Sequence, residues 1–300
     1  MPQSKAKSTS PATADGRIPI VLCADDYGLA PGVGRAIRDL LARGRLSATS
    51  CMTVSAFWPD EGAALRPFAQ RADIGLHLTL TDQRPLGPMP RLAPSGRLPS
   101  IARLIVLAYT RQLPREEVAA ELTRQIDRFE AVFGHPPAYL DGHQHAHQLP
   151  VIRDVVIELF QHRLASHGGY LRYCVEPLGS ILTRRLFIGE SLIISLLGRR
   201  LAQRGRRAGI PGNRRFRGVH DFSGRRPYAQ LFAAFLENAE PGTLIMCHPG
   251  LSDAALAAAD PVTSAREEEY RYFLSDEFAA TIDKTAVLSR FPAAAHLQRQ

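Results

Sequence analysis

The chain alternates short apolar runs with segments of helical periodicity, and this alternation constrains its fold more than any other feature. Residues 18–24 form a continuous apolar run, which is typical of a strand buried on both faces of a parallel sheet. Further strand patterns cover residues 46–54, 73–80, 138–140, 170–175 and 244–247, and helical patterns cover residues 33–42, 114–133, 151–160 and 227–236. This order predicts an α/β fold with a mainly parallel sheet, either open or closed into a barrel of β/α units.

Length and composition predict one large globular domain or two small ones. The 300 residues are 45% hydrophobic and 22% charged, close to the globular average, which excludes a wholly disordered chain. We expect a single domain at residues 17–290, between flexible tails at residues 1–16 and 291–300. The first tail lacks the apolar core of a secretory signal, no apolar run approaches the ~20 residues of a membrane span, and the four cysteines show no paired spacing. These features predict a cytoplasmic protein.

The positive charge is concentrated in one segment. The net charge is +8, and residues 184–226 contain twelve arginines but only two acidic residues. We interpret residues 182–226 as a basic insertion. Its first part, residues 182–208, fits either a helix docked at the inner face of an anionic membrane or an ordinary helix with solvated arginines. A nucleic-acid partner is not predicted, because the sequence shows no zinc finger, helix-turn-helix or aromatic-interleaved strand.

Side chains that can bind a metal ion occur where several of the predicted strands end. They are Asp25 and Asp26 after the first strand, His77 within the third, Asp141 and His143 after the fourth, and His248 after the last. The carboxyl ends of parallel strands converge on one pocket, and two histidines with one aspartate are a usual ligand set for a catalytic divalent ion. Structural interpretations also exist, because an Asp pair can cap a helix, a lone histidine can lie in the core and His248 can belong to a turn.

Residues 141–147 read Asp-Gly-His-Gln-His-Ala-His and contain three of the ten histidines. If this segment is extended, His143, His145 and His147 share one face. Only one or two of them need to touch an ion, and the others can bind substrate or hold the ligands in place. The alternative is a solvated polar loop.

Four motifs together resemble one known family. They are Ala-Asp-Asp-Tyr-Gly at residues 24–28, Gly-Leu-His-Leu-Thr at 75–79, Leu-Asp-Gly-His-Gln-His-Ala-His at 140–147 and Met-Cys-His-Pro at 246–249. In order and spacing they resemble the YdjC-like carbohydrate deacetylases over roughly residues 18–272. The sequence departs from the family pattern at Tyr27, where Phe is common, and at Gly142 and Gln144, where Ser and His are frequent.

The resemblance implies a distorted β/α barrel that removes an N-acetyl group from an amino sugar. It implies Asp26, His77 and His143 as ligands of one divalent ion, with zinc or magnesium expected first and manganese or cobalt as alternatives. It also implies Asp25 as the general base and a protonated His248 as the acid or oxyanion partner. The remaining candidates, for substrate binding or for support of the ligands, are Asp141, His145, His147 and Tyr27.

Two other functions stay open. The same ion could serve the hydrolysis of another amide or of a phosphoester, or the chain could bind carbohydrate without catalysis. The expected partner is an N-acetylated sugar, either an oligosaccharide or a glycolipid, and a homodimer is left open.

Overall fold

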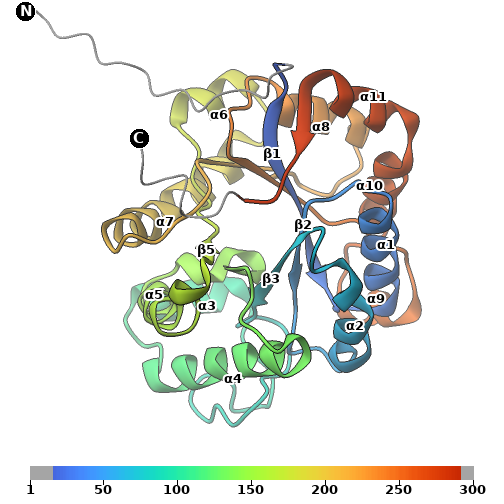
Figure 1. The fold of residues 1–300 in the computed structure, drawn as a ribbon. Helices are drawn as coiled ribbons and strands as arrows, with labels where there is room; N and C mark the ends of the chain where they lie inside the picture. Colours follow the sequence, from blue (N-terminus) through green and yellow to red (C-terminus); the bar gives the residue numbers. More distant parts are fainter. Residues whose placement is uncertain (1–15, 292–300) are drawn as a thin grey trace, which may run out of the picture.

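The computed structural model describes residues 16–291, which form one sheet enclosed by helices (Figure 1). The strands are β1 (Ile18–Tyr27), β2 (Ala48–Cys51), β3 (Asp73–Leu78), β4 (Tyr139–Gly142), β5 (Tyr170–Leu171), β6 (Arg215–Arg217), β7 (Thr243–Cys247) and β8 (Ala286–Leu288). The α-helices are α1 (Pro31–Ala42), α2 (Trp58–Leu65), α3 (Ile101–Tyr109), α4 (Arg115–Phe133), α5 (Ile152–Leu159), α6 (Leu178–Arg184), α7 (Ile188–Arg207), α8 (Tyr228–Leu236), α9 (Ala254–Ala259), α10 (Ser264–Leu274) and α11 (Asp276–Thr285). Apart from Gly16 and Phe291, the two predicted tails lie outside the described residues.

The sheet curves into a distorted barrel, which confirms the predicted fold class. The strands follow the order β5-β4-β3-β2-β1-β7-β6, β8 pairs with the start of β1, and the pairs are parallel. Leu171 of β5 forms a further parallel bridge to Gly212, just before β6, which brings the two edges of the sheet together. Because the strands are parallel, their carboxyl ends all open at one end of the barrel.

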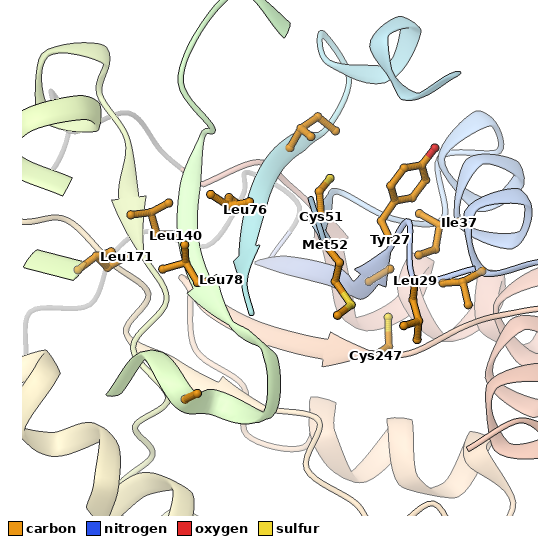
Figure 2. Close-up of a cluster of buried hydrophobic side chains, with 14 of the residues drawn as sticks. Tyr27, Leu29, Ile37, Cys51, Met52, Leu76, Leu78, Leu140, Leu171 and Cys247 are labelled. Carbon is orange, nitrogen blue, oxygen red and sulfur yellow. The ribbon is translucent and has the colours of Figure 1, made fainter. Parts of the chain in front are cut away.

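The outward face of the sheet packs against the surrounding helices. Cys51, Leu76, Leu140 and Leu171 are register partners on β2 to β5, so their side chains form one row across four strands (Figure 2). All four are fully buried, as are the apolar positions of α4 at spacings of three and four. Gly134 ends α4 in the left-handed conformation that favours glycine, as the sequence predicts.

The inward face carries a second apolar cluster, whose residues come from six strands, among them Val21, Tyr139 and Tyr170. A Cβ at Gly75 would lie 2.2 Å from the Tyr139 ring, so only glycine at this position leaves room for the tyrosine. Tyr170 stacks on Tyr139 at 4.8 Å and on Phe291 at 4.2 Å between ring centroids. These three rings fill the amino-terminal end of the barrel.

The basic segment contributes to the fold as well as to the surface. It forms the last three residues of α6 and all of α7 and β6, so part of it belongs to the sheet. Arg184 and Arg217 both pair with the buried carboxylate of Glu176, at 2.7 and 2.8 Å. Arg215 pairs with Glu240 at 2.6 Å, and Arg204 pairs with Asp154. Several of the twelve arginines are therefore structural.

The structure differs from the sequence interpretation in two segments near the barrel opening. The strand predicted at residues 170–175 pairs only at Tyr170 and Leu171. The histidine-rich segment is not extended: residues 143–148 form a 3-10 turn, with Gln144 and His145 at φ 50° and 59°. Backbone at positive φ breaks the two-residue alternation, so the three histidines do not share a face.

Candidate active site

The two-residue alternation of the strands carries the candidate residues into the barrel opening. On five strands, a residue that faces the inside of the barrel is followed two positions later by a polar residue that faces the same way. The polar residues are Asp25, His77, Asp141, Arg172 and His248, and the residues two positions before them are Cys23, Gly75, Tyr139, Tyr170 and Met246. Four of these strands therefore bury an apolar side chain deep in the barrel, β3 has Gly75 there, and all five present a polar side chain near their carboxyl ends. Five polar groups from five strands converge at this opening.

Asp26 reaches the same opening through a local irregularity in β1. Consecutive residues of a regular strand point to opposite faces, so Asp25 and Asp26 could not both face inward. The pairing of β1 with β2 shifts register between Ala24 and Tyr27, and Asp26 has φ 64°. A left-handed conformation costs a non-glycine residue about 1–2 kcal/mol, although aspartate tolerates it better than most. This strain places two adjacent carboxylates in one site.

The structure brings together the three side chains predicted as metal ligands. Asp26, His77 and His143 each offer a ligand atom within 4.8 Å of the others. Oδ1 of Asp26 lies 3.0 Å from Nδ1 of His143 and 3.4 Å from Nε2 of His77. One carboxylate oxygen and two imidazole nitrogens thus converge, and this donor set suits a catalytic divalent cation with further positions left for water and substrate.

Asp141 fixes the orientation of His77. Its Oδ1 accepts a hydrogen bond from Nδ1 of His77 at 2.8 Å and another from the hydroxyl of Ser50. This contact keeps the proton on Nδ1 and turns Nε2 towards Asp26, the arrangement that carboxylate partners impose on metal-binding histidines. Burial disfavours the charged imidazole, but Asp141 and Asp25 outweigh it and raise the pKa of His77 to about 10. A divalent cation would compete with that proton.

Arg172 holds Asp25. Its two terminal nitrogens donate to the two oxygens of Asp25, each at 2.6 Å, and one of them also lies 2.7 Å from Oδ2 of Asp141. All three side chains are buried. Burial is the largest single influence and raises the pKa of Asp25, but the charge and hydrogen bonds of Arg172, together with nearby His77 and His248, outweigh it and hold that pKa well below its ordinary value. Asp25 therefore stays ionised throughout the neutral pH range.

His248 also lies near Asp25. Its Nε2 is 4.0 Å from Oδ2 of Asp25, and its side chain is 14% exposed. Burial lowers the pKa of His248 in spite of the nearby Asp26 and Asp25 carboxylates. From the sequence His248 is expected to be protonated, whereas these surroundings favour a neutral imidazole that gains a proton only during a reaction.

Three other predicted site residues have different surroundings. His147 is buried, donates from Nε2 to the carbonyl of Arg172 at 3.1 Å, and has its pKa lowered to about 4 by burial. His145 lines the cavity but packs beside Cys174 and Phe216, and burial holds its pKa well below the ordinary value. Tyr27 points into the core, where its hydroxyl donates to the carbonyl of Glu61 (Figure 2). The structure does not place Tyr27 at the site.

Two buried arginines at the site, Arg172 and Arg266, are not among the residues predicted from the sequence. Arg172 continues the inward pattern of β5, so a charged residue inside the run Tyr-Leu-Arg-Tyr-Cys at residues 170–174 is a signal that could have found it. Arg266 comes from α10 and donates to Oδ2 of Asp26 at 2.6 Å. It lies among several charged residues of a helix, where nothing in the local pattern distinguishes it.

The converging side chains line a cavity of about 610 Å³, a volume in the usual range of small-molecule sites. Asp25, Asp26, His77, His143 and His248 form its deep wall. The rest of its lining comes from the loop after β3, the histidine-rich turn, α7, residues 219–222 and residues 259–262. The arrangement combines a cation-binding set, an ionised carboxylate and a histidine within one concave surface.

Two known proteins are similar to this chain in sequence. The chitooligosaccharide deacetylase of Proteus mirabilis is 34% identical over 144 residues, covering 48% of this chain and 56% of that protein. The chitooligosaccharide deacetylase of Yersinia pestis (strain Pestoides F) is 33% identical over 184 residues, covering 58% of this chain and 70% of that protein. The match to the Proteus relative therefore spans little more than half of its length.

A solved structure shares the fold. A protein of Enterococcus faecalis V583, whose name proposes cellobiose-phosphate cleavage, superposes with a TM-score of 0.69 at 19% identity, covering 94% of this chain and 99% of that one. The sequence profile of the YdjC-like protein family matches residues 19–284. This range includes all four motifs, strands β2 to β7 and all of β1 except Ile18, whereas β8 lies just beyond it. The chain therefore belongs to the YdjC-like family, as the motifs predict.

Proposed function

We propose that this protein is a metal-dependent hydrolase that removes an N-acetyl group from an amino sugar. The observation that carries the proposal is the convergence of Asp26, His77 and His143 beside Asp25 and His248 in one cavity. The names of the Proteus and Yersinia relatives, which are chitooligosaccharide deacetylases, support the reaction and the substrate class.

Asp26, His77 and His143 would hold the cation. Their donor set fits zinc, and also magnesium, manganese or cobalt when waters complete the coordination. When bound, a divalent cation supplies Lewis-acid polarisation of the acetamide carbonyl and lowers the pKa of water. Arg266 keeps the second oxygen of Asp26 occupied, so that one oxygen remains for the cation.

Asp25 is the proposed general base. Its carboxylate stays ionised beside Arg172 and can accept a proton from the water that attacks the acetamide carbon. Arg172 also fixes both carboxylate oxygens, which removes the need to orient them during the reaction. Arg172 thus acts as a positioning residue for Asp25.

His248 is the proposed acid for the leaving amine. An amine leaves only after its nitrogen gains a proton, and His248 is neutral before the reaction. Oδ2 of Asp25 and Nε2 of His248 lie 4.0 Å apart, so one intervening water can carry the proton from Asp25 to His248, which then passes it to the amine nitrogen. The hydroxide equivalent remains on the acetyl carbon, and the products are acetate and a free amino sugar.

Removing the metal is expected to stop the reaction. After dialysis against a chelator, acetate release from N-acetylated chitooligosaccharides should fall by at least about 100-fold, because carbonyl polarisation is lost. Adding back zinc, magnesium, manganese and cobalt separately, with bound metal measured for each, will identify the active ion. Parallel assays with other amides and phosphoesters provide the control, because turnover of one of these without acetate release would contradict the proposal.

We further propose that α6 and α7 contact an anionic membrane surface at the cytoplasmic side. Ile193 and Leu196 are 61% and 54% exposed on α7, Leu178 and Leu182 are 48% exposed on α6, and exposed arginines such as Arg199 follow on α7. Apolar side chains that insert and cations that pair with lipid phosphates complement such a surface. Within residues 16–291, no helix has both the length and the apolar character needed to cross a bilayer.

The membrane contact can be measured by cosedimentation with vesicles. At low salt we expect binding to vesicles rich in anionic lipid and much weaker binding to neutral ones, since each basic residue near the surface contributes about 1 kcal/mol. The double variant Ile193→Ser, Leu196→Ser should bind several-fold less, whereas Val106→Ser on α3 serves as an exposed apolar control. Equal sedimentation with and without anionic vesicles would rule the contact out.

A further inference from the structure

A second group of metal-competent side chains lies beside the proposed catalytic residues. His220, His248 and Glu269 each offer a ligand atom within 4.8 Å of the others. Glu269 belongs to α10 and is fully buried, His248 follows β7, and His220 lies between β6 and α8. Two imidazoles and one carboxylate are a ligand set that zinc uses in enzymes.

One nitrogen of this group is unpaired. Nδ1 of His248 is buried and has no hydrogen-bond partner among the described residues. Buried polar atoms are nearly always paired, so an orphaned imidazole nitrogen beside a buried carboxylate marks a position that favours a cation. The other ring nitrogen, Nε2, lies 4.0 Å from Oδ2 of Asp25, whose negative charge favours the ring hydrogen on Nε2 when Nδ1 acts as a ligand.

Glu269 connects the two histidines. Its Oε1 lies 2.9 Å from Nε2 of His220, and its Oε2 accepts a hydrogen bond from the main-chain N–H of His248 at 2.5 Å. His220 and His248 also line the cavity of about 610 Å³, so an ion from solvent has an entry path.

We propose that His220, His248 and Glu269 form a second, weaker zinc site whose occupation inhibits the enzyme. The site is weaker because the main-chain N–H of Phe222 donates to Nδ1 of His220 at 3.3 Å. A neutral histidine that binds zinc through Nε2 carries its proton on Nδ1, so zinc binding must break this hydrogen bond. The proposed catalytic set has no such conflict, because Asp141 already keeps the proton of His77 on Nδ1.

Inhibition follows from the chemistry of His248. When Nδ1 binds zinc, Nε2 carries the single remaining ring proton and has no lone pair with which to accept another. His248 can then no longer take the proton from Asp25 and pass it to the leaving amine. The inhibition rests on the proposed function, whereas the zinc site itself does not.

Zinc stoichiometry tests the site directly. The purified full-length protein is dialysed against increasing free zinc, and bound zinc per chain is measured by mass spectrometry. We expect bound zinc to rise from about one to about two per chain, with the second ion bound at least about tenfold more weakly. His220→Gln and, independently, Glu269→Gln should retain about one zinc at the same concentrations, while His162→Gln, an exposed histidine, should still take up two.

Activity provides a second and separate readout. Acetate release by the wild type should decline over the zinc range that fills the weaker site, and His220→Gln should show no decline over that range relative to its own starting rate. A second zinc that persists in both His220→Gln and Glu269→Gln, or a wild type that never exceeds one zinc, would overturn the proposal. If no variant releases acetate, the proposed function fails, but the stoichiometry still decides whether the second site exists.

Discussion

Replacing Asp25 by asparagine is expected to lower acetate release by about 10²- to 10⁴-fold, the usual contribution of a general base, while leaving the bound metal in place. Asparagine has nearly the same shape as aspartate but cannot accept the proton from water. Asp26, His77 and His143 are untouched by this change, so metal content should remain that of the wild type.

The matched variant for this experiment is His143→Ala. It removes one of the converging imidazoles, so it should lose both bound metal and activity. Comparing the two variants separates loss of the base from loss of the cation. If Asp25→Asn keeps activity within tenfold of the wild type, Asp25 is not the base, and if it loses the metal, Asp25 belongs to the cation site instead.

Replacing Arg172 by methionine is expected to destabilise the protein by about 3–5 kcal/mol, because it leaves buried carboxylates without their cation. Arg172 is itself fully buried and pairs with both Asp25 and Asp141. Urea unfolding at pH 7 measures the loss. Arg172→Met combined with Asp25→Asn should be less destabilised than the sum of the two single variants, since one stranded charge is gone.

The pH dependence of this loss has a defined sign. In the wild type the pKa of Asp25 lies below its unfolded value of about 3.9, so its contribution to stability is present above that pH and is lost only as the pH falls further. In Arg172→Met, burial is opposed only by the weaker influence of His77 and His248, so we expect the pKa of Asp25 to rise above the unfolded value and stability to be lost as the pH rises. The difference in free energy of unfolding between the wild type and Arg172→Met should therefore become smaller as the pH is lowered from 7 to 5.

Two results would contradict this interpretation of Arg172. One is a destabilisation below about 1 kcal/mol, which is typical of a surface ion pair and not of a buried one. The other is a difference in free energy of unfolding between Arg172→Met and the wild type that does not change with pH. Arg172→Lys, which keeps one positive charge but not the forked contact, provides a milder variant should the methionine form fold poorly.

The barrel and most of its site could be predicted from the two-residue periodicity of the strands. The apolar run at residues 18–24 and the leucine alternation in β3 identify buried strands, and the polar residues at their ends then meet at one opening. The convergence of Asp25, His77 and His248 follows from this periodicity together with the parallel arrangement. Local pattern and global fold agree at these positions.

Other parts of the site depend on contacts that local sequence does not encode. Asp26 faces inward only because β1 shifts register at a residue with positive φ, and regular alternation predicts the opposite. The histidine-rich segment is a turn and not a strand, so of its three histidines only His143 converges with Asp26 and His77. Arg266 and Glu269 reach the site from α10, more than two hundred residues after Asp26, and only tertiary packing brings them there.

The left-handed backbone at position 26 also limits which amino acids can occupy it. Glycine would relax the main chain but would remove the carboxylate, and glutamate would keep a carboxylate but lacks the short side chain that makes aspartate tolerable at positive φ. Asparagine fits the backbone and lacks only the charge. Mutational tolerance at this position is therefore set jointly by conformational cost and by chemistry, and substitutions that improve folding there are expected to be those that abolish turnover.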